Sequence, residues 1–83
     1  MTSEFVSVLL FARYKDLLGA SSIAVPRSEA ATVQSMVRYL RSLPGGAELP
    51  EAPFVAVNQQ QASPDLPIGP TDEIALLPPM AGG

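Results

Sequence analysis

One segment of this sequence has a clear helical period, and it restricts the fold more than any other feature. Its apolar residues recur at i, i+3, i+4 and i+7, and they are Val33, Met36, Val37 and Leu40, with Leu43 continuing the stripe. Thr32 stands at the N-cap position, and Ser35 occupies the place of the acidic capping-box residue, so we expect a single hydroxyl cap. Residues 44–46 (PGG) end the helix. A lone amphipathic helix must bury its stripe against other elements.

Short strands are the elements available for this purpose. Strand-like patterns occupy residues 4–12, 21–25, 54–58 and 72–78. The second should end at Pro26, because proline cannot donate to a ladder, and Asp72 and Glu73 should serve the turn into the last. Residues 13–19 change to a helical period and end on a glycine suited to a left-handed C-cap. Residues 59–70 are expected to be irregular, with a short edge strand around 61–63. This order predicts one α+β domain, residues 1–83, with a mixed sheet packed on one main helix.

The first strand is apolar on both of its faces. Val6, Val8, Leu10 and Ala12 share one face, and Phe5, Leu9 and Phe11 share the other with Ser7. Such a strand is either covered on both sides, as a central strand is, or presents one side to a partner.

Composition excludes several classes of function. The chain of 83 residues contains neither cysteine nor histidine, so a thiolate zinc site, a disulfide framework and an imidazole general base are all missing. We therefore expect no metal and no cofactor bound by this chain, and no catalysis by it alone. A net charge of -3 with five scattered basic residues disfavours nucleic acid. The longest apolar run is too short for a membrane span, and we expect a cytoplasmic protein.

The end of the chain, LLPPMAGG, is shaped for a specific use. Pro78 and Pro79 stiffen the exit from the last strand, and residues 78–83 can extend by roughly 20 Å. Gly82 and Gly83 carry no Cβ, so a narrow tunnel could close around their backbone. The carboxylate of Gly83 is ionised at neutral pH and is a poor electrophile until it is activated.

Three pieces of the sequence carry a resemblance to a known family. FARYKDLLG near the start, AVNQ at 56–59 and DEIALLPPMAGG at the end resemble the small subunit of molybdopterin synthase, a MoaD-type ubiquitin-like sulfur carrier. Leu76 and Leu77 stand where that family often has two aromatics, and Thr71 stands where it usually has glycine.

The resemblance implies a β-grasp fold and a C-terminal Gly83 that is adenylated and converted to a thiocarboxylate. It also implies three partners: a large catalytic subunit in a heterotetrameric synthase, an adenylating E1-like enzyme that uses ATP, and a sulfur donor. The tail residues that would thread into the large subunit are Pro78, Pro79, Met80, Ala81 and Gly82. Phe11, Leu76 and Leu77 are candidates for the docking surface, with core packing as the competing interpretation.

Two other functions remain open from the sequence. The chain could carry sulfur for another pathway, such as thiazole synthesis. It could also be a protein modifier joined through Gly83 to lysines of target proteins.

Overall fold

The structure is a computed structural model, and it describes residues 4–78. Its elements are β1 (Phe5–Leu10), α1 (Ala12–Leu18), β2 (Ser22–Pro26), the 3-10 turn η1 (Arg27–Glu29), α2 (Val33–Arg41), the 3-10 turn η2 (Gly46–Glu48), β3 (Phe54–Val57), β4 (Gln60–Gln61) and β5 (Ile74–Leu77). Each helix and strand that the sequence predicts is present, with ends displaced by one or a few residues. Within these residues no helix is long and apolar enough to cross a bilayer.

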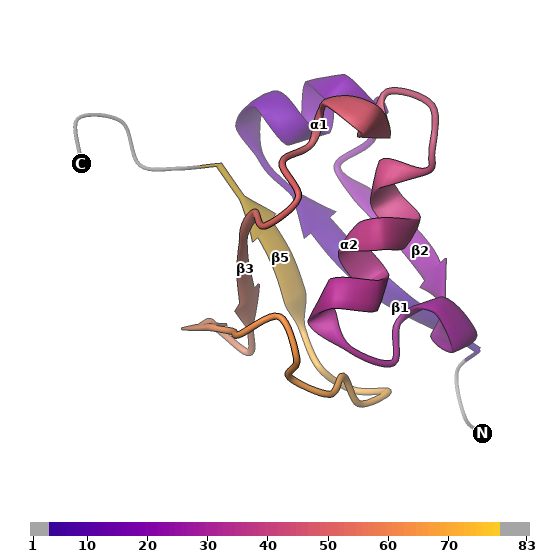
Figure 1. Ribbon diagram of the computed structural model, residues 1–83, viewed down its shortest axis with the longest axis vertical. Helices are drawn as coiled ribbons and strands as arrows, with labels where there is room; N and C mark the ends of the chain where they lie inside the picture. The colour runs from indigo at the N-terminus through magenta and orange to yellow at the C-terminus, as the bar shows by residue number, and fades with distance from the viewer. Residues whose placement is uncertain (1–3, 79–83) are drawn as a thin grey trace.

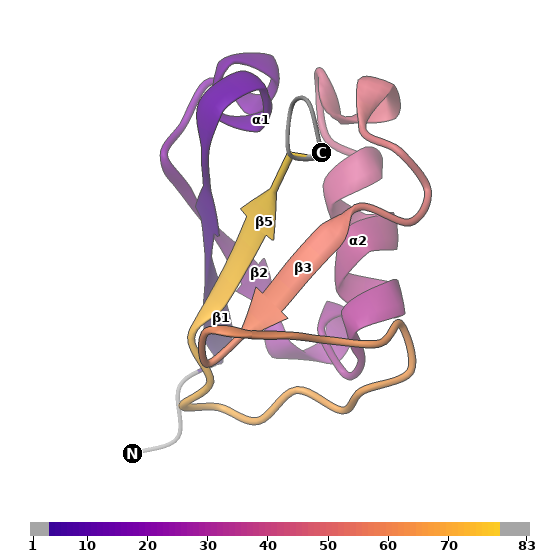
Figure 2. The same ribbon diagram turned by 90° about the vertical axis from the view of Figure 1, so that its left-hand side faces the viewer.

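The strands form one mixed sheet in the order β2-β1-β5-β3-β4 (Figures 1 and 2). The central pair, β1 and β5, is parallel, and the other neighbouring pairs are antiparallel. Helix α2 lies across one face of this sheet (Figure 1). The N-terminal and C-terminal strands therefore lie side by side beneath one helix, and the predicted β-grasp fold is confirmed.

The core lies between α2 and the sheet. From α2 the buried side chains are Val33, Met36, Val37 and Leu40, which are the predicted stripe. The strands contribute alternate residues: Val6, Val8 and Leu10 from β1, Val55 and Val57 from β3, and Ile74 and Leu76 from β5. Burying each large apolar side chain contributes roughly 1.5–3 kcal/mol, so these residues are the main stabilising contribution of the fold.

The start of α2 is capped more fully than the sequence predicts. The Ser35 N–H donates to Thr32 Oγ1 at 3.2 Å, and the Thr32 N–H donates to Ser35 Oγ at 3.0 Å. The prediction of a single hydroxyl cap is therefore wrong. A serine hydroxyl can accept the reciprocal bond because the third helical residue lies directly over the N-cap.

Three turns shape the ends of the elements. Gly19 ends α1 in the left-handed conformation, with φ 73°, as predicted. Asn58 and Gln59 both have positive φ in the tight turn between β3 and β4. Thr71 does not take a positive φ, so the turn into β5 needs no glycine there. Strand β2 ends at Pro26 as predicted, although its range is shifted by one residue from 21–25, since Pro26 itself pairs with Phe5. The missing N–H of Pro26 costs nothing because that position faces the open edge of the sheet.

Candidate functional site

The candidate site is the end of β5, from which the C-terminal tail departs. Leu76 pairs with Leu10 of β1 on one side and with Val55 of β3 on the other. Leu77 pairs with Phe54 and is followed directly by Pro78. Because β5 has a bonded neighbour on each side, the position at which the chain leaves the sheet is fixed (Figure 2). The other predicted tail residues, namely Pro79, Met80, Ala81, Gly82 and Gly83, lie outside the described residues.

The two leucines before the tail point to opposite faces of the sheet. Leu76 is 0% exposed and packs in the core, whereas Leu77 on the other face is partly exposed. The prediction that Leu76 contributes to a partner surface is therefore wrong. Adjacent residues of a strand alternate between faces, so only one of the two could lie on the outer surface.

An apolar patch surrounds the exit of the tail on the sheet face opposite α2. We call it the outer-face patch, and its residues are Leu9, Phe11, Phe54, Ala56, Ala75 and Leu77. The strand register builds it, because Leu9 and Ala56 both pair with Ala75 while Phe54 pairs with Leu77. Phe11 extends β1 with strand-like φ and ψ, so continuing the register places it on the other side of Leu77. All six residues of the patch are apolar.

Two aromatic rings dominate this patch. Phe11 is 45% exposed and Phe54 is 43% exposed, which is high for phenylalanines in a small domain. An exposed cluster of this kind is typical of a protein interface. The exposure of Phe11 and the partial exposure of Leu77 agree with the predicted docking surface, although the docking itself stays a prediction.

Sequence reasoning missed Phe54 as a member of this surface. The sequence places Phe54 on a different face from Val55 and Val57, and that alternation is present. What the sequence did not show is that β3 pairs with β5, which brings Phe54 beside Leu77. A long-range strand pairing leaves no local signal.

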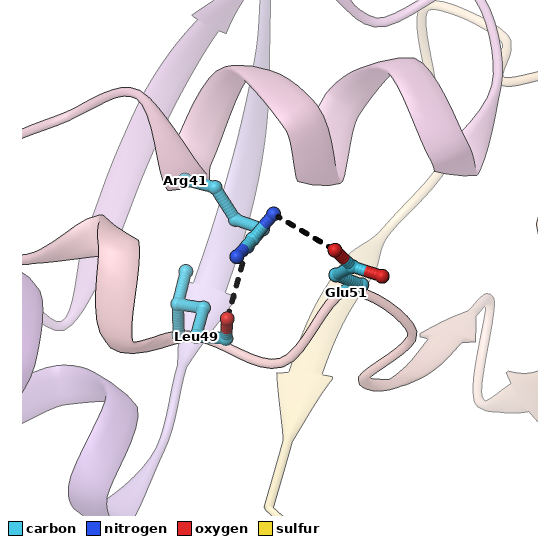
Figure 3. A network of polar contacts seen from close by, with 3 residues as sticks. All are labelled: Arg41, Leu49 and Glu51. Atoms are coloured by element: carbon cyan, nitrogen blue, oxygen red, sulfur yellow. Dashed lines mark hydrogen bonds and ion pairs between the residues drawn. The ribbon is translucent and has the colours of Figure 1, made fainter.

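The segment that leads into β3 is tied to the end of α2 (Figure 3). Arg41 Nε donates to the Leu49 carbonyl at 3.0 Å, and Arg41 Nη1 lies 4.0 Å from Glu51 Oε1. Leu49 is itself only 1% exposed, so this segment is anchored on both sides. These contacts attach the segment that precedes β3 to the end of α2. A hollow of about 410 Å³ beside this segment is lined by apolar residues of α2, of β3 and of the loops before β3 and after β4, together with Gln34, Glu51 and Gln61.

The acidic turn lies at the other end of β5, away from the tail. Asp72 accepts the Gly69 N–H at 2.7 Å and the Asn58 amide at 3.0 Å, and the Asn58 side chain accepts the Glu73 N–H at 2.9 Å. The Gly69 N–H and then the Asn58 amide hold the pKa of Asp72 below its ordinary value. The prediction that Asp72 and Glu73 serve the turn into the last strand is confirmed.

Residues 4–78 contain no group of three or more His, Cys, Asp or Glu side chains placed to hold a metal ion.

Comparison with known proteins shows the family to which this chain belongs. Residues 8–83 match the ThiS family. The chain belongs to the ThiS family. The chain is similar to the molybdopterin synthase sulfur carrier subunit of Dictyostelium discoideum, at 35% identity over the full length of both chains. It is also similar to the subunit of the same name from Arabidopsis thaliana, at 28% identity over 99% of this chain and 86% of that one. The resemblance of the sequence to MoaD-type small subunits is thus confirmed.

Several solved structures of similar proteins have the same fold. SAMP1 from Haloferax volcanii has a TM-score of 0.74 and 26% identity, over 93% of this chain and 97% of that one. A putative molybdopterin converting factor subunit 1 from Pyrococcus furiosus has a TM-score of 0.78 and 23% identity, over 94% and 100%. The complex of subunits 1 and 2 of the molybdopterin-converting factor from Helicobacter pylori matches with a TM-score of 0.68 and 22% identity, over 95% and 99%.

Proposed function

We propose that this chain is the sulfur-carrying small subunit of a molybdopterin synthase. The observation that carries the proposal is the outer-face patch around the exit of the chain at Pro78, where an apolar surface adjoins a tail that ends in Gly82 and Gly83. A tail of this kind can enter a partner's pocket while the patch holds the two proteins together. The similarity over full length to two curated sulfur carrier subunits supports the proposal.

The proposed chemistry takes place on the carboxyl group of Gly83. An activating enzyme joins this carboxylate to AMP from ATP and releases pyrophosphate, which gives an acyl-adenylate. A sulfur donor then attacks the carbonyl carbon and AMP leaves. If the donor is a persulfide, a second thiol must cleave its S–S bond to release the thiocarboxylate. In this proposal ATP is bound by the activating partner and no cofactor is bound by this chain.

The proposed acceptor is a pterin precursor in the active site of the large subunit. The complex of subunits 1 and 2 from Helicobacter pylori supports a large-subunit partner. We assign the outer-face patch to this contact, because it surrounds the root of the tail that must reach the active site. The chain has no histidine and no cysteine, so the groups that transfer protons are assigned to the large subunit.

Intact-mass measurement tests the chemistry directly. The purified chain is incubated with ATP, an activating enzyme and a sulfur donor, and the expected product shows the mass gain of one oxygen exchanged for one sulfur. The same chain without ATP is the control. In a second assay the sulfur-loaded chain is mixed with the pterin precursor, with and without the large subunit. Sulfur transfer only when the large subunit is present would support the rest of the proposal. A chain that converts precursor without the large subunit would contradict it.

The similarity to SAMP1 supports a second candidate function. A second solved structure, of small archaeal modifier protein 1 from Haloferax volcanii, has a TM-score of 0.77 and 23% identity to this chain. At this identity the likeness shows a shared fold alone. A modifier would join Gly83 to lysines of other proteins, and incubation with cell extract and ATP would give a ladder of conjugates. A sulfur carrier for thiazole synthesis would instead give the thiocarboxylate but no molybdopterin.

A further inference from the structure

Strand β2 forms an open edge of the sheet. In the sheet order it has β1 on one side, and within residues 4–78 no strand pairs with its other side. The strand is five residues long, and the side chains of Ser22 and Ala24 are exposed. The opposite edge is different, because β4 has only two residues. A longer open edge presents backbone groups that another strand can bind.

The register identifies the backbone groups that face outward from β2. The Leu10 N–H donates to the Ser21 carbonyl at 2.8 Å, and the Arg27 N–H donates to the Glu4 carbonyl at 2.9 Å. Bonded pairs alternate along an antiparallel ladder, so Ile23 and Val25 between these two points also direct their backbone groups toward β1. The N–H and C=O groups of Ser22 and Ala24 consequently point away from the sheet.

This edge lacks the features that usually prevent pairing. Residues 20–26 (ASSIAVP) contain no charged side chain. Natural proteins commonly protect an open edge with lysine, with proline, with a bulge or with a very short strand. Pro26 is the sole feature of this kind here, and it stands at the last position of the strand.

We propose that β2 pairs with β2 of a second copy of this chain, antiparallel and related by a two-fold axis through Ile23. In this register Ser22 lies opposite Ala24 of the second copy. Each Ser22 N–H donates to an Ala24 carbonyl and each Ala24 N–H donates to a Ser22 carbonyl. Pro26 falls opposite Ala20, at the margin of the paired segment. A register centred on Ala24 would instead place Pro26, which has no N–H, opposite Ser22 and leave the Ser22 carbonyl without a donor.

The side chains at this pairing are compatible with a second copy. The two Ile23 side chains are half-buried at the edge of the core and would meet across the axis, which covers their remaining exposed surface. No charged residue of either copy lies within the paired segment, so no like charges face each other there. The same two-fold pairing would join two sheets into one.

The pairing leaves the candidate functional site free. Strand β1 separates β2 from β5, which carries the tail, so each copy could still present its outer-face patch. An edge contact alone is smaller than a standard interface of roughly 1,200–2,000 Å², and the association should therefore be weak. This inference does not depend on sulfur transfer.

Analytical ultracentrifugation over a concentration series tests the proposal, up to about 1 mM, where weak complexes become populated. The test variant is Ala24→Lys, which places a charge on the edge. The matched control is Ser7→Lys, because Ser7 is exposed on the same face and pairs directly with Ala24, but belongs to the interior strand β1. The parent chain and Ser7→Lys should approach the mass of a dimer, and Ala24→Lys should bind about two- to fivefold more weakly, because the two introduced lysines become diagonal neighbours across the pairing.

A second variant and a spectroscopic measurement guard against misfolding. Ala24→Pro removes the outward N–H and leaves the bonds from Ile23 and Val25 to β1 in place, so it should also weaken the dimer. In NMR spectra of the parent chain, the amide signals of Ser22 and Ala24 should shift with concentration more than those of Ile23 and Val25. A chain that stays monomeric at about 1 mM would overturn the proposal. Equal weakening by Ala24→Lys and Ser7→Lys would overturn it as well, since it would place the contact on the sheet face.

Discussion

At the scale of single residues, the glycine pair Gly45–Gly46 has a structural role that its sequence does not reveal. Gly45 is left-handed with φ 84°, and a Cβ there would overlap the carbonyl oxygen of Leu17. A Cβ on Gly46 would overlap the carbonyl oxygen of Leu40. The loop after α2 therefore passes closer to the backbones of α1 and α2 than any other residue type would allow. The sequence suggests only that the pair terminates the helix.

Comparison of two glycine variants isolates this close approach. Gly19 has a similar φ of 73°, but a Cβ there meets nothing within 4 Å. Gly19→Ala should lower the free energy of unfolding by about 1–2 kcal/mol, because only the left-handed conformation is penalised. Gly45→Ala should lower the free energy of unfolding by about 1–3 kcal/mol more than Gly19→Ala, because the loop must also move away from the backbone of α1. Urea denaturation measures both, and equal losses for the two variants would show that the loop can yield.

The carboxylate of Asp72 should make stability depend on pH in the acidic range. Its pKa is lowered from the ordinary 3.8 by the Gly69 N–H and then by the Asn58 amide. Its stabilising contribution is therefore complete above that value, and it is lost as the pH falls from 3.8 through the lower pKa of the folded state. Asp72→Asn should destabilise the protein at pH 6, and the difference from the parent should shrink below pH 4 or so. Urea denaturation at several pH values checks this; a difference that stays constant with pH would contradict the assignment.

At the scale of elements, pairing of β5 with β1 and β3 assembles the outer-face patch from three segments far apart in sequence. Phe11 follows β1, Phe54 begins β3 and Leu77 ends β5. Each of these segments contributes one large apolar side chain that is exposed or partly exposed. The parallel pairing of β1 with β5 and the antiparallel pairing of β3 with β5 bring their ends together beside Pro78.

Charge placed on this patch should separate binding from folding. Leu77→Asp should weaken binding to the large subunit by about tenfold or more, because a carboxylate would be desolvated in an apolar contact. The matched control is Leu66→Asp, since Leu66 is also an exposed leucine, at 36%, but lies in the irregular segment before β5. Titration calorimetry measures both affinities, and circular dichroism checks that both variants fold. Equal affinity for Leu77→Asp and the parent would place the interface elsewhere.

At the scale of the whole molecule, the described core and the proposed reacting group belong to separate parts of the chain. Within residues 4–78 the buried residues nearest to the C-terminus are Ile74 and Leu76, while the proposed reacting group is on Gly83. Changes at the end of the tail should therefore alter the chemistry and leave the core intact. Stability and activity can be measured independently in this protein.

Extension of the chain by one alanine after Gly83 is the sharpest test of this separation. The added residue displaces the reacting carboxylate by about 3.3–3.6 Å, well beyond the tolerance of about 0.5 Å for a productive geometry. Thiocarboxylate formation, followed by intact mass, should be lost, and reconstituted molybdopterin synthesis should be lost with it. The free energy of unfolding should match that of the parent. Deletion of Gly83 should behave in the same way, whereas an extended chain that still carries sulfur would refute the C-terminal mechanism.

The local features of this fold could be predicted from the sequence because they depend on residues close together in the chain. The helix stripe of Val33, Met36, Val37 and Leu40, the left-handed Gly19 and the alternating strands all follow from side-chain period and backbone sterics. The resemblance of the end of the chain to MoaD-type carriers added the family, which the comparisons confirm.

The tertiary structure alone decided which surface is available, because exposure depends on strand pairings that link distant residues. From the sequence, Leu76 and Leu77 are equal candidates for the docking surface. Leu76 is buried because its side chain lies on the sheet face that α2 covers. The sequence did not indicate that Phe54 would lie beside Leu77, because that requires β3 to pair with β5. It likewise could not show that Ser22 and Ala24 direct their backbone groups outward, since only the register with β1 determines this. Local period sets which side chains share a face, and long-range pairing sets what that face meets.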